Sequence, residues 1–432
     1  MFGEEIRRYG FWFVAALRGG QIRQYVSEIE KKLQGKTDTS SEDLRNLFNH
    51  AVSTTEFYGR FRGCSNINDF PVIKKSLIKE KYNQFISSDY KDKKLHKVQT
   101  SGSTGERFIL LQDMRKRKRV IAELIYFYDQ CGFRLGYRYV YLRVWHKDNM
   151  KSGIVRIAEN MIMFDCSSLS DLSLAKLYEL LMKDRSIKCL AGYATSLTAI
   201  AFYFDKKGYT PDMFNLEVIS SGAERLELNA KAMLKKIFGC PVVSRYSNNE
   251  NGLLAQQPVD SDHFILNTAH YFFETLKLDN DEPAVYGEPA RLVLTDLYNY
   301  AMPMIRYDTE DIVIMEKQSD GPSKRDILMD ISGRKADTIY DTRGDKISPH
   351  HVALQFRSYD RLPEYQFVQD AIKQYTVRLE GVQGVYNDEN MINHFKKLVG
   401  EDANIKIDHV DQIPRLSSGK LRKIICNYHP ET

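Results

Sequence analysis

The sequence predicts an α/β protein with two domains: a large N-terminal domain, residues 1–334, and a small α+β C-terminal domain, residues 335–432. Its 432 residues exceed the usual size of one domain. Strand-like and helical segments also alternate through the centre of the chain and again near its C-terminus. Strands that alternate with helices build a sheet covered by helices, which binds ligands at the strand ends.

The expected elements follow in chain order. Residues 41–90 are expected to form short packing helices, one of them capped by Ser41. Strands at 95–99 and 108–111 flank a loop, and a helix follows from 113 to 130. The central segments are strands at 139–144, 189–190 and 218–219 and helices at 173–182 and 228–238. Later strands are expected at 291–295, 304–306, 312–315, 375–379 and 405–410, with a helix at 389–399.

The composition argues against a largely disordered chain and against a general nucleic-acid-binding protein. Hydrophobic residues make up 43% and charged residues 28% of the chain, which is ordinary for a soluble globular protein. The 62 basic and 57 acidic residues leave a net charge of +5, which predicts no general affinity for nucleic acid. Six scattered cysteines favour reduced thiols and a cytoplasmic location.

Two local segments allow other interpretations. The apolar run 11–17 is too short for a transmembrane segment and lacks a signal-peptide cleavage site. We expect Phe11, Trp12 and Phe13 to pack on the core, with a membrane-surface helix as the alternative. The five cations of 115–119 are expected to form a solvated helix face, with contact to nucleic acid or anionic lipid as the alternative.

The loop between the two early strands contains only hydroxyl-bearing residues and glycine. It consists of Thr100, Ser101, Gly102, Ser103, Thr104 and Gly105. Hydroxyl and amide donors can converge here on a phosphate, because glycine allows a positive φ. The loop lacks the Gly-Lys-Ser/Thr ending of a P-loop. A flexible turn is the alternative.

Two further segments have groups suited to a nucleotide. A small-residue surface on which a planar ring could lie follows an apolar strand, and its residues are Ser221, Gly222, Ala223 and Glu224. A plain strand-to-helix turn is the alternative. Tyr246 and Glu250, four residues apart with Asn249 between them, could stack on a base and hold a cation.

Charged groups follow in the last third of the chain. Asp311 could accept hydrogen bonds from two ribose hydroxyls, unless its segment is only a solvated acidic turn. Arg334 could bridge ribose and phosphate through its planar guanidinium. Residues 414–422 form a small-residue loop that could deliver Lys420 into a site, with a basic surface tail as the alternative.

In this order, the motifs resemble those of the adenylate-forming acyl-activating (ANL) superfamily over residues 95–425. Segments 141–145, 192–196 and 302–307 look like the phenylacetate-CoA ligase-like branch, which is similar to capsular polysaccharide biosynthesis proteins. The resemblance implies an N-terminal adenylation domain that binds ATP and the acyl group, and a C-terminal lid domain that carries the catalytic lysine.

The resemblance also implies an ATP-dependent, AMP-forming ligase. It would activate a small carboxylic acid with ATP and Mg²⁺ and transfer the acyl group to coenzyme A, an acyl-CoA synthetase reaction. Transfer to an amine or amino sugar in capsule or O-antigen biosynthesis is one alternative, and a non-catalytic nucleotide-binding relative is another. No nucleic-acid partner is expected.

By the same resemblance, the motif residues receive roles. Residues 100–105 would grip the ATP phosphates, and 221–224 with Tyr246 and Asn249 would surround adenine. Asp311 would hold the ribose hydroxyls. The residues expected at the reacting groups are Arg334 at the ribose and α-phosphate, Glu250 on Mg²⁺, and Lys420 at the carboxylate and α-phosphate.

The chain departs from the family pattern at several positions. Many members have Gly, Thr and Gly where this chain has Ser247, Asn249 and Glu310. Ala336 replaces the first acid of the family hinge, which leaves the lid rotation open. The acid, the acyl acceptor and the oligomeric state are not readable from the sequence. Candidate acyl-pocket residues, for which core packing is an equal interpretation, are Trp145, His146, Tyr193 and Met304.

Overall fold

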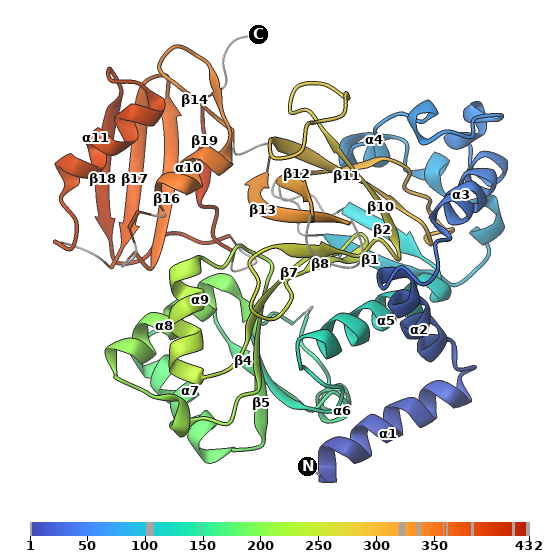
Figure 1. Ribbon diagram of the computed structural model, residues 1–432, viewed down its shortest axis with the longest axis horizontal. Coiled ribbons are helices and arrows are strands. Elements are labelled where there is room, and N and C mark those ends of the chain that lie inside the picture. Colours follow the sequence, from blue (N-terminus) through green and yellow to red (C-terminus); the bar gives the residue numbers. More distant parts are fainter. Residues whose placement is uncertain are drawn as a thin grey trace. The chain divides into compact units, whose positions relative to one another are not determined.

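The computed structural model divides into two compact units (Figure 1). Unit 1 comprises Met1–Gly136 and Arg245–Asp330, and unit 2 comprises Tyr137–Ser244 and Ile331–Thr432. The structure describes residues 2–100, 108–147, 149–318, 325–334, 338–356, 358–359, 362–381, 384–416 and 420–428. The predicted α/β fold class is confirmed. The predicted domain boundary between residues 334 and 335 stays a prediction.

Unit 1 begins with helices. They are α1 (Phe2–Leu17), α2 (Gln21–Leu33), α3 (Ser40–Thr54), α4 (Lys75–Glu80) and the 3-10 helices η1 (Tyr58–Phe61), η2 (Ile67–Asp69), η3 (Tyr82–Phe85) and η4 (Ser88–Tyr90). The cap of α3 is Thr39, not Ser41 as predicted. Core packing was also predicted for Phe13, but its side chain is 66% exposed. No helix in the described part of the chain has both the length and the hydrophobicity to cross a bilayer.

The rest of unit 1 is mostly antiparallel sheet. The elements are β1 (His96–Thr100), β2 (Phe108–Gln112), α5 (Met114–Gln130), β7 (Val242–Asn248), β8 (Gly252–Gln256), β9 (Phe264–Leu266), β10 (Tyr271–Leu276), β11 (Pro289–Asp296), β12 (Tyr307–Lys317) and β13 (Asp326–Arg334). β1 and β2 form a hairpin, and the other strands lie in the order β10-β11-β12-β13-β9-β8-β7. The predicted strand 304–306 is wrong, because Met304 and Ile305 are fully buried in a hydrophobic cluster and Arg306 has a φ of 54°.

Unit 2 contains a parallel sheet in the order β7-β6-β5-β3-β4. Its elements are β3 (Arg138–Arg143), α6 (Gly153–Ala158), β4 (Met161–Asp165), α7 (Asp171–Lys183), β5 (Ile187–Tyr193), α8 (Ala194–Lys206), η5 (Pro211–Met213), β6 (Val218–Gly222) and α9 (Leu228–Phe238). The side chains of α7, α8 and α9 form one hydrophobic core with these strands, and the three helices gather beside them in Figure 1.

The C-terminal part of unit 2 has its own four-stranded sheet, in the order β18-β17-β16-β19. The elements are β14 (Ile339–Tyr340), β15 (Lys346–Ile347), α10 (Pro349–Phe356), β16 (Glu364–Ala371), β17 (Gln374–Glu380), α11 (Asp388–Val399), β18 (Asn404–Val410) and β19 (Ile424–Cys426). Side chains of α10 and α11 pack with these strands in a separate hydrophobic core, as an α+β domain requires.

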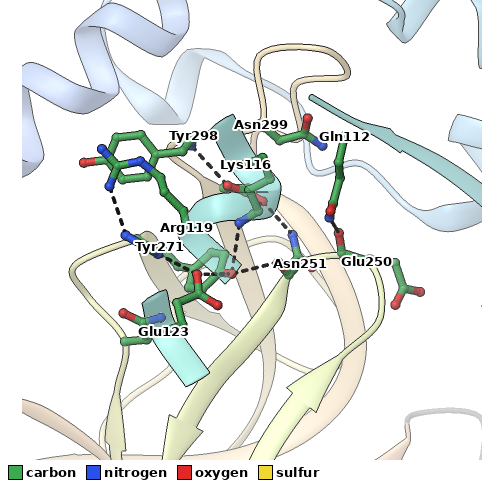
Figure 2. A network of polar contacts seen from close by, with 12 residues as sticks. Gln112, Lys116, Arg119, Glu123, Glu250, Asn251, Tyr271, Tyr298 and Asn299 are labelled. Carbon is green, nitrogen blue, oxygen red and sulfur yellow. Dashed lines mark hydrogen bonds and ion pairs between the residues drawn. The ribbon is translucent and has the colours of Figure 1, made fainter. Parts of the chain in front are cut away.

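A buried polar network in unit 1 fixes the turn between β7 and β8 (Figure 2). Lys116 is fully buried, and its Nζ lies 2.8 Å from Asp296 Oδ2 and 3.0 Å from Tyr271 Oη. Tyr271 Oη also lies 2.9 Å from the carbonyl oxygen of Asn251. The ammonium therefore compensates a buried carboxylate and orients the hydroxyl that holds this turn.

Glu123 extends the network from α5 to β8. Its Oε2 accepts a hydrogen bond of 3.1 Å from the Leu253 amide, and its Oε1 lies 2.5 Å from His270 Nδ1. Burial raises the pKa of Glu123 to about 7, and burial beside Arg119 and Lys116 holds the pKa of His270 well below its usual value. Burial thus disfavours the charged form of both partners.

The network corrects the prediction for residues 115–119. Lys116 and Arg119 are buried rather than solvated. The Arg119 guanidinium donates to both carboxylate oxygens of Glu28, at 3.2 and 3.1 Å, and lies 3.5 Å from the centre of the Tyr298 ring. A five-cation surface for nucleic acid or lipid is therefore excluded.

Gly192 of β5 lies close against Leu142 of β3. It pairs with Leu142, and a Cβ at position 192 would lie 2.5 Å from Leu142 Cβ and 2.6 Å from Leu142 O. We expect Gly192→Ala to lower the free energy of unfolding by about 1–3 kcal/mol, because the strands must move apart. Urea denaturation measures this. Gly153→Ala, where no atom lies within 4 Å, is the control, and equal stability of the two variants would contradict the prediction.

Lys116→Met tests the buried network. The substitution leaves the Asp296 carboxylate buried without its cation, so we expect a loss of about 3–5 kcal/mol in the free energy of unfolding. Thermal and urea denaturation measure the loss. Lys118→Met on the same helix is the matched control, because Lys118 makes an exposed hydrogen bond to Gln21. A loss no larger than that of the control would show that the pair contributes nothing.

Candidate active site

The side chains of Tyr246 and Asp311 meet in unit 1. Tyr246 lies on β7, and its hydroxyl donates a hydrogen bond of 2.5 Å to Asp311 Oδ2 on β12. Asp311 belongs to an irregularity of β12, opposite the register shift between Arg291 and Val293 of β11. Such a bulge changes the direction of a side chain. The predicted base-stacking ring and the predicted ribose carboxylate are therefore adjacent.

Glu310 stands at a position where many family members have glycine. Its φ is 63°, a left-handed conformation that glycine adopts without steric cost. Its amide donates a hydrogen bond of 2.8 Å to Asp308 Oδ1, which stabilises the turn. The position where many family members have glycine thus has the backbone conformation that favours glycine, although this chain has glutamate there.

The β1–β2 hairpin is tied to the β7–β8 turn. Asn249 Nδ2 donates to the carbonyl of Gln99 at 3.3 Å, and Gln112 Nε2 donates to the carbonyl of Glu250 at 2.9 Å. The hydroxyl loop 100–105 leaves β1 one residue after Gln99. Ser101 to Gly105 lie outside the described residues, and Thr100 is described only as the last residue of β1. The base of the loop is therefore close to the segment that carries Glu250.

Glu250 has a cationic neighbour that sequence reasoning missed. Lys75, the first residue of α4, has its Nζ 3.6 Å from Glu250 Oε1 and 5.0 Å from the centre of the Phe108 ring. Phe108 is the first residue of β2, after the hydroxyl loop. Lys74 and Lys75 stand at the N-terminus of α4, where the helix dipole disfavours cations. This unfavourable placement was the signal that could have identified Lys75.

The turn after β6 lies in unit 2. Ser221 and Gly222 end β6, and Ala223 has a φ of 69°. A non-glycine residue in this conformation is strained, and such residues cluster at functional sites. The Glu224 carboxylate that follows accepts from Thr195 and Leu421. Glu224 is therefore already engaged by protein groups, and its predicted role toward the nucleotide stays a prediction.

The remaining predicted residues belong to unit 2. Arg334 ends β13, and the structure describes its backbone only. Residues 335–337, including Ala336 at the family hinge position, lie outside the described residues. Lys420 is partly buried, and its carbonyl accepts a hydrogen bond of 2.9 Å from the Leu416 amide. The amide of the next residue, Leu421, donates to Glu224, but the structure does not test the roles of Lys420 and Arg334.

The acyl-pocket candidates have different environments. Met304 is fully buried in a hydrophobic cluster of unit 1, as core packing requires. In unit 2, Trp145 donates from Nε1 to the carbonyl of Phe164 at 3.2 Å, and its ring centre lies 5.8 Å from the Arg143 guanidinium. Tyr193 follows at the end of β5 and is 9% exposed. Three of the four candidates, Trp145, His146 and Tyr193, thus follow or end neighbouring strands of one sheet.

The chain resembles known proteins over most of its length. Residues 339–427 match the family model of the CapK C-terminal domain. The chain is 25% identical to Protein CapK of Staphylococcus aureus over 433 aligned residues, 94% of this chain and 93% of CapK. It is 23% identical to a phenylacetate-coenzyme A ligase of Thermus thermophilus, over 55% of this chain and 59% of the ligase.

A solved structure shares the fold. It is 2-hydroxyisobutyryl-CoA ligase in the postadenylation state with R3-HIB-AMP, and the TM-score is 0.69. The match covers 90% of this chain and 89% of the ligase at 16% identity. The resemblance expected from the motifs is confirmed: the chain is similar to CapK over nearly its whole length and more distantly similar to phenylacetate-coenzyme A ligases, and it has the fold of an adenylate-forming ligase.

Proposed function

We propose that the chain is an AMP-forming ligase that activates a carboxylic acid with ATP and transfers the acyl group to coenzyme A. The adjacency of Tyr246 and Asp311 in unit 1 supports this most directly, with a hydrogen bond of 2.5 Å between them. A phenol ring beside a carboxylate suits an adenosine, because the ring can stack on the base while the carboxylate accepts from ribose hydroxyls. The names of the phenylacetate and 2-hydroxyisobutyryl ligases support the choice of coenzyme A.

The donor set suits Mg²⁺ and phosphate. Carboxylate oxygen is the ligand that Mg²⁺ prefers, and one or two carboxylates with substrate phosphates complete most such sites. Glu250 provides this carboxylate beside the base of the hydroxyl loop, and Lys75 adds an ammonium 3.6 Å from it. Mg²⁺ held by Glu250 would neutralise charge on the leaving pyrophosphate.

The reaction has two steps. In the first, a carboxylate oxygen of the acid attacks the α-phosphorus, the bond to the β-phosphate oxygen breaks, and pyrophosphate leaves. Lys420 would offset the negative charge that develops around the α-phosphate, and Arg334 would hold the ribose and α-phosphate. In the second, the thiol sulfur of coenzyme A attacks the acyl carbon, loses its proton to solvent, and displaces AMP. We place the reaction in the cytoplasm, where the six free cysteines stay reduced.

An amine acceptor is the second candidate. CapK matches 94% of this chain, whereas the Thermus coenzyme A ligase matches 55%. The acyl acceptor of a coenzyme A ligase therefore does not transfer directly to this chain. In this reaction the amine nitrogen of an amino sugar or amino acid would attack the adenylate, release AMP and form an amide.

Pyrophosphate exchange tests adenylation. We expect incorporation of labelled pyrophosphate into ATP with at least one acid of a panel containing phenylacetate, anthranilate, 2-hydroxyisobutyrate, malonate and long-chain fatty acids. Lys420→Ala should lower the exchange rate by about 100-fold or more, because the developing charge loses its cation. ATP affinity should change little. Lys406→Ala is the control, because Lys406 is exposed and pairs with Asp408 on β18. Wild-type exchange in Lys420→Ala would contradict the assigned role.

Tyr246→Phe tests the nucleotide site. The variant keeps the ring but removes the hydroxyl that orients Asp311, so we expect ATP to bind about 3- to 10-fold more weakly, the effect of one lost hydrogen bond. Isothermal titration calorimetry with ATP measures the affinity without any acid. Unchanged affinity in Tyr246→Phe together with unchanged affinity in Asp311→Asn would contradict the placement of the ribose.

A further inference from the structure

The peptide bond between Lys420 and Leu421 is held at both of its polar atoms. Its carbonyl oxygen accepts from the Leu416 amide at 2.9 Å, and its N–H donates to Glu224 Oε1 at 2.7 Å. The hydrogen bond to Glu224 is charge-assisted, which makes it stronger than a bond between neutral groups. The backbone beside the Lys420 side chain is therefore fixed in place and orientation.

Glu224 is itself fixed by the start of α8. Its Oε2 accepts from the Thr195 amide at 3.2 Å and from Thr195 Oγ1 at 2.9 Å. The two carboxylate oxygens thus bind different segments, because Oε2 accepts from the first turn of α8 and Oε1 accepts from the C-terminal segment. Glu224 therefore fixes the backbone at Leu421 relative to the parallel sheet and α8.

A second acid of the same turn holds the next part of the segment. Lys423 Nζ lies 2.8 Å from Glu227 Oε1 and 3.7 Å from Glu364 Oε2, and 4.6 Å from the centre of the Tyr365 ring. Glu364 is buried, and burial raises its pKa to about 7. Burial opposes the charge on Lys423, but Glu227 and Glu364 raise its pKa above the usual value. The lysine therefore stays charged between two acids.

We infer that Glu224 and Glu227 are positioning residues for Lys420, which fix the segment 420–423 so that the lysine ammonium is presented in the adenylation step. This inference rests on the proposed function. Neither acid contacts a reacting atom in this proposal; both act through the backbone and through Lys423. A long, flexible lysine side chain contributes to a transition state only when its backbone is held, because a misplacement of about 1 Å can cost about 100-fold in rate.

Limited trypsin digestion tests the contact without any substrate. Trypsin cleaves after Lys420, Arg422 and Lys423, and these bonds are accessible only when the segment opens. We expect Glu224→Ala and Glu227→Gln to increase the rate of these cleavages by about tenfold, the change in open population that corresponds to 1.4 kcal/mol. Glu224→Gln keeps one acceptor oxygen for the Leu421 amide but turns its NH₂ group toward the Thr195 amide, so it should restore only part of the protection. Unchanged cleavage rates would overturn the inference.

Asp205→Asn is the matched control for cleavage. Asp205 also lies in unit 2 and pairs with a lysine, Lys236, at 3.0 Å, but this pair is on the surface. Its variant should keep wild-type cleavage at residues 420–423. If Asp205→Asn also accelerates cleavage, general loss of stability explains the effect and the inference fails.

The two half-reactions separate positioning from general damage. With the most active acid of the panel, Glu224→Ala should lower kcat of pyrophosphate exchange about tenfold or more and leave KM for ATP within about twofold, with partial rescue by Glu224→Gln. Thioester formation from the preformed adenylate of that acid and coenzyme A should be unchanged. An equal loss in both half-reactions would indicate a structural defect and overturn the inference.

The outcomes distinguish this inference from the proposed function. If the wild-type protein catalyses no exchange with any acid, the proposed function fails, and the positioning role fails with it. If the wild-type protein catalyses exchange and both variants match it, only the positioning role fails.

Discussion

The ion pair between Lys116 and Asp296 is the constraint on which the candidate site in unit 1 depends. Both side chains are fully buried, so the cost of removing their charges from water must be met by their 2.8 Å contact and by Tyr271. Tyr271 in turn lies against the carbonyl of Asn251, next to Glu250. The turn that carries Glu250, the carboxylate proposed to bind Mg²⁺, is thus held by a buried charge pair.

The same arrangement recurs in unit 2 with other residues. Glu224 accepts a hydrogen bond from the Leu421 amide, and Glu227 pairs with the Lys423 side chain. These acids hold the C-terminal segment, as the α5 network holds the β7–β8 turn. Rigid support behind a polar site lowers the reorganisation that the reaction requires.

The fold class and most elements could be predicted, because hydrophobic periodicity is local. Helix 228–238 and the C-terminal alternation at 375–379 lie where the pattern placed them. The strand predicted at 304–306 failed, because an apolar run signals burial and does not by itself determine an extended conformation. For the site, a family resemblance supplied Glu250, Asp311 and Lys420, whereas Lys75 was missed because its partner Glu250 is 175 residues away in the sequence.

By itself, the sequence determined the residue types: a hydroxyl loop for phosphate, carboxylates, a tail lysine, and a periodicity that builds an α/β sheet. Only the tertiary structure decided which charges are paired. Five consecutive cations, as in 115–119, are typical of a solvated helix face, but the side chains of Lys116 and Arg119 are buried in the protein. Glu224, which is half-buried, likewise accepts hydrogen bonds from two distant segments. The reason is that a charge is buried only where distant segments bring it a partner. No local sequence pattern predicts which distant residue that partner is.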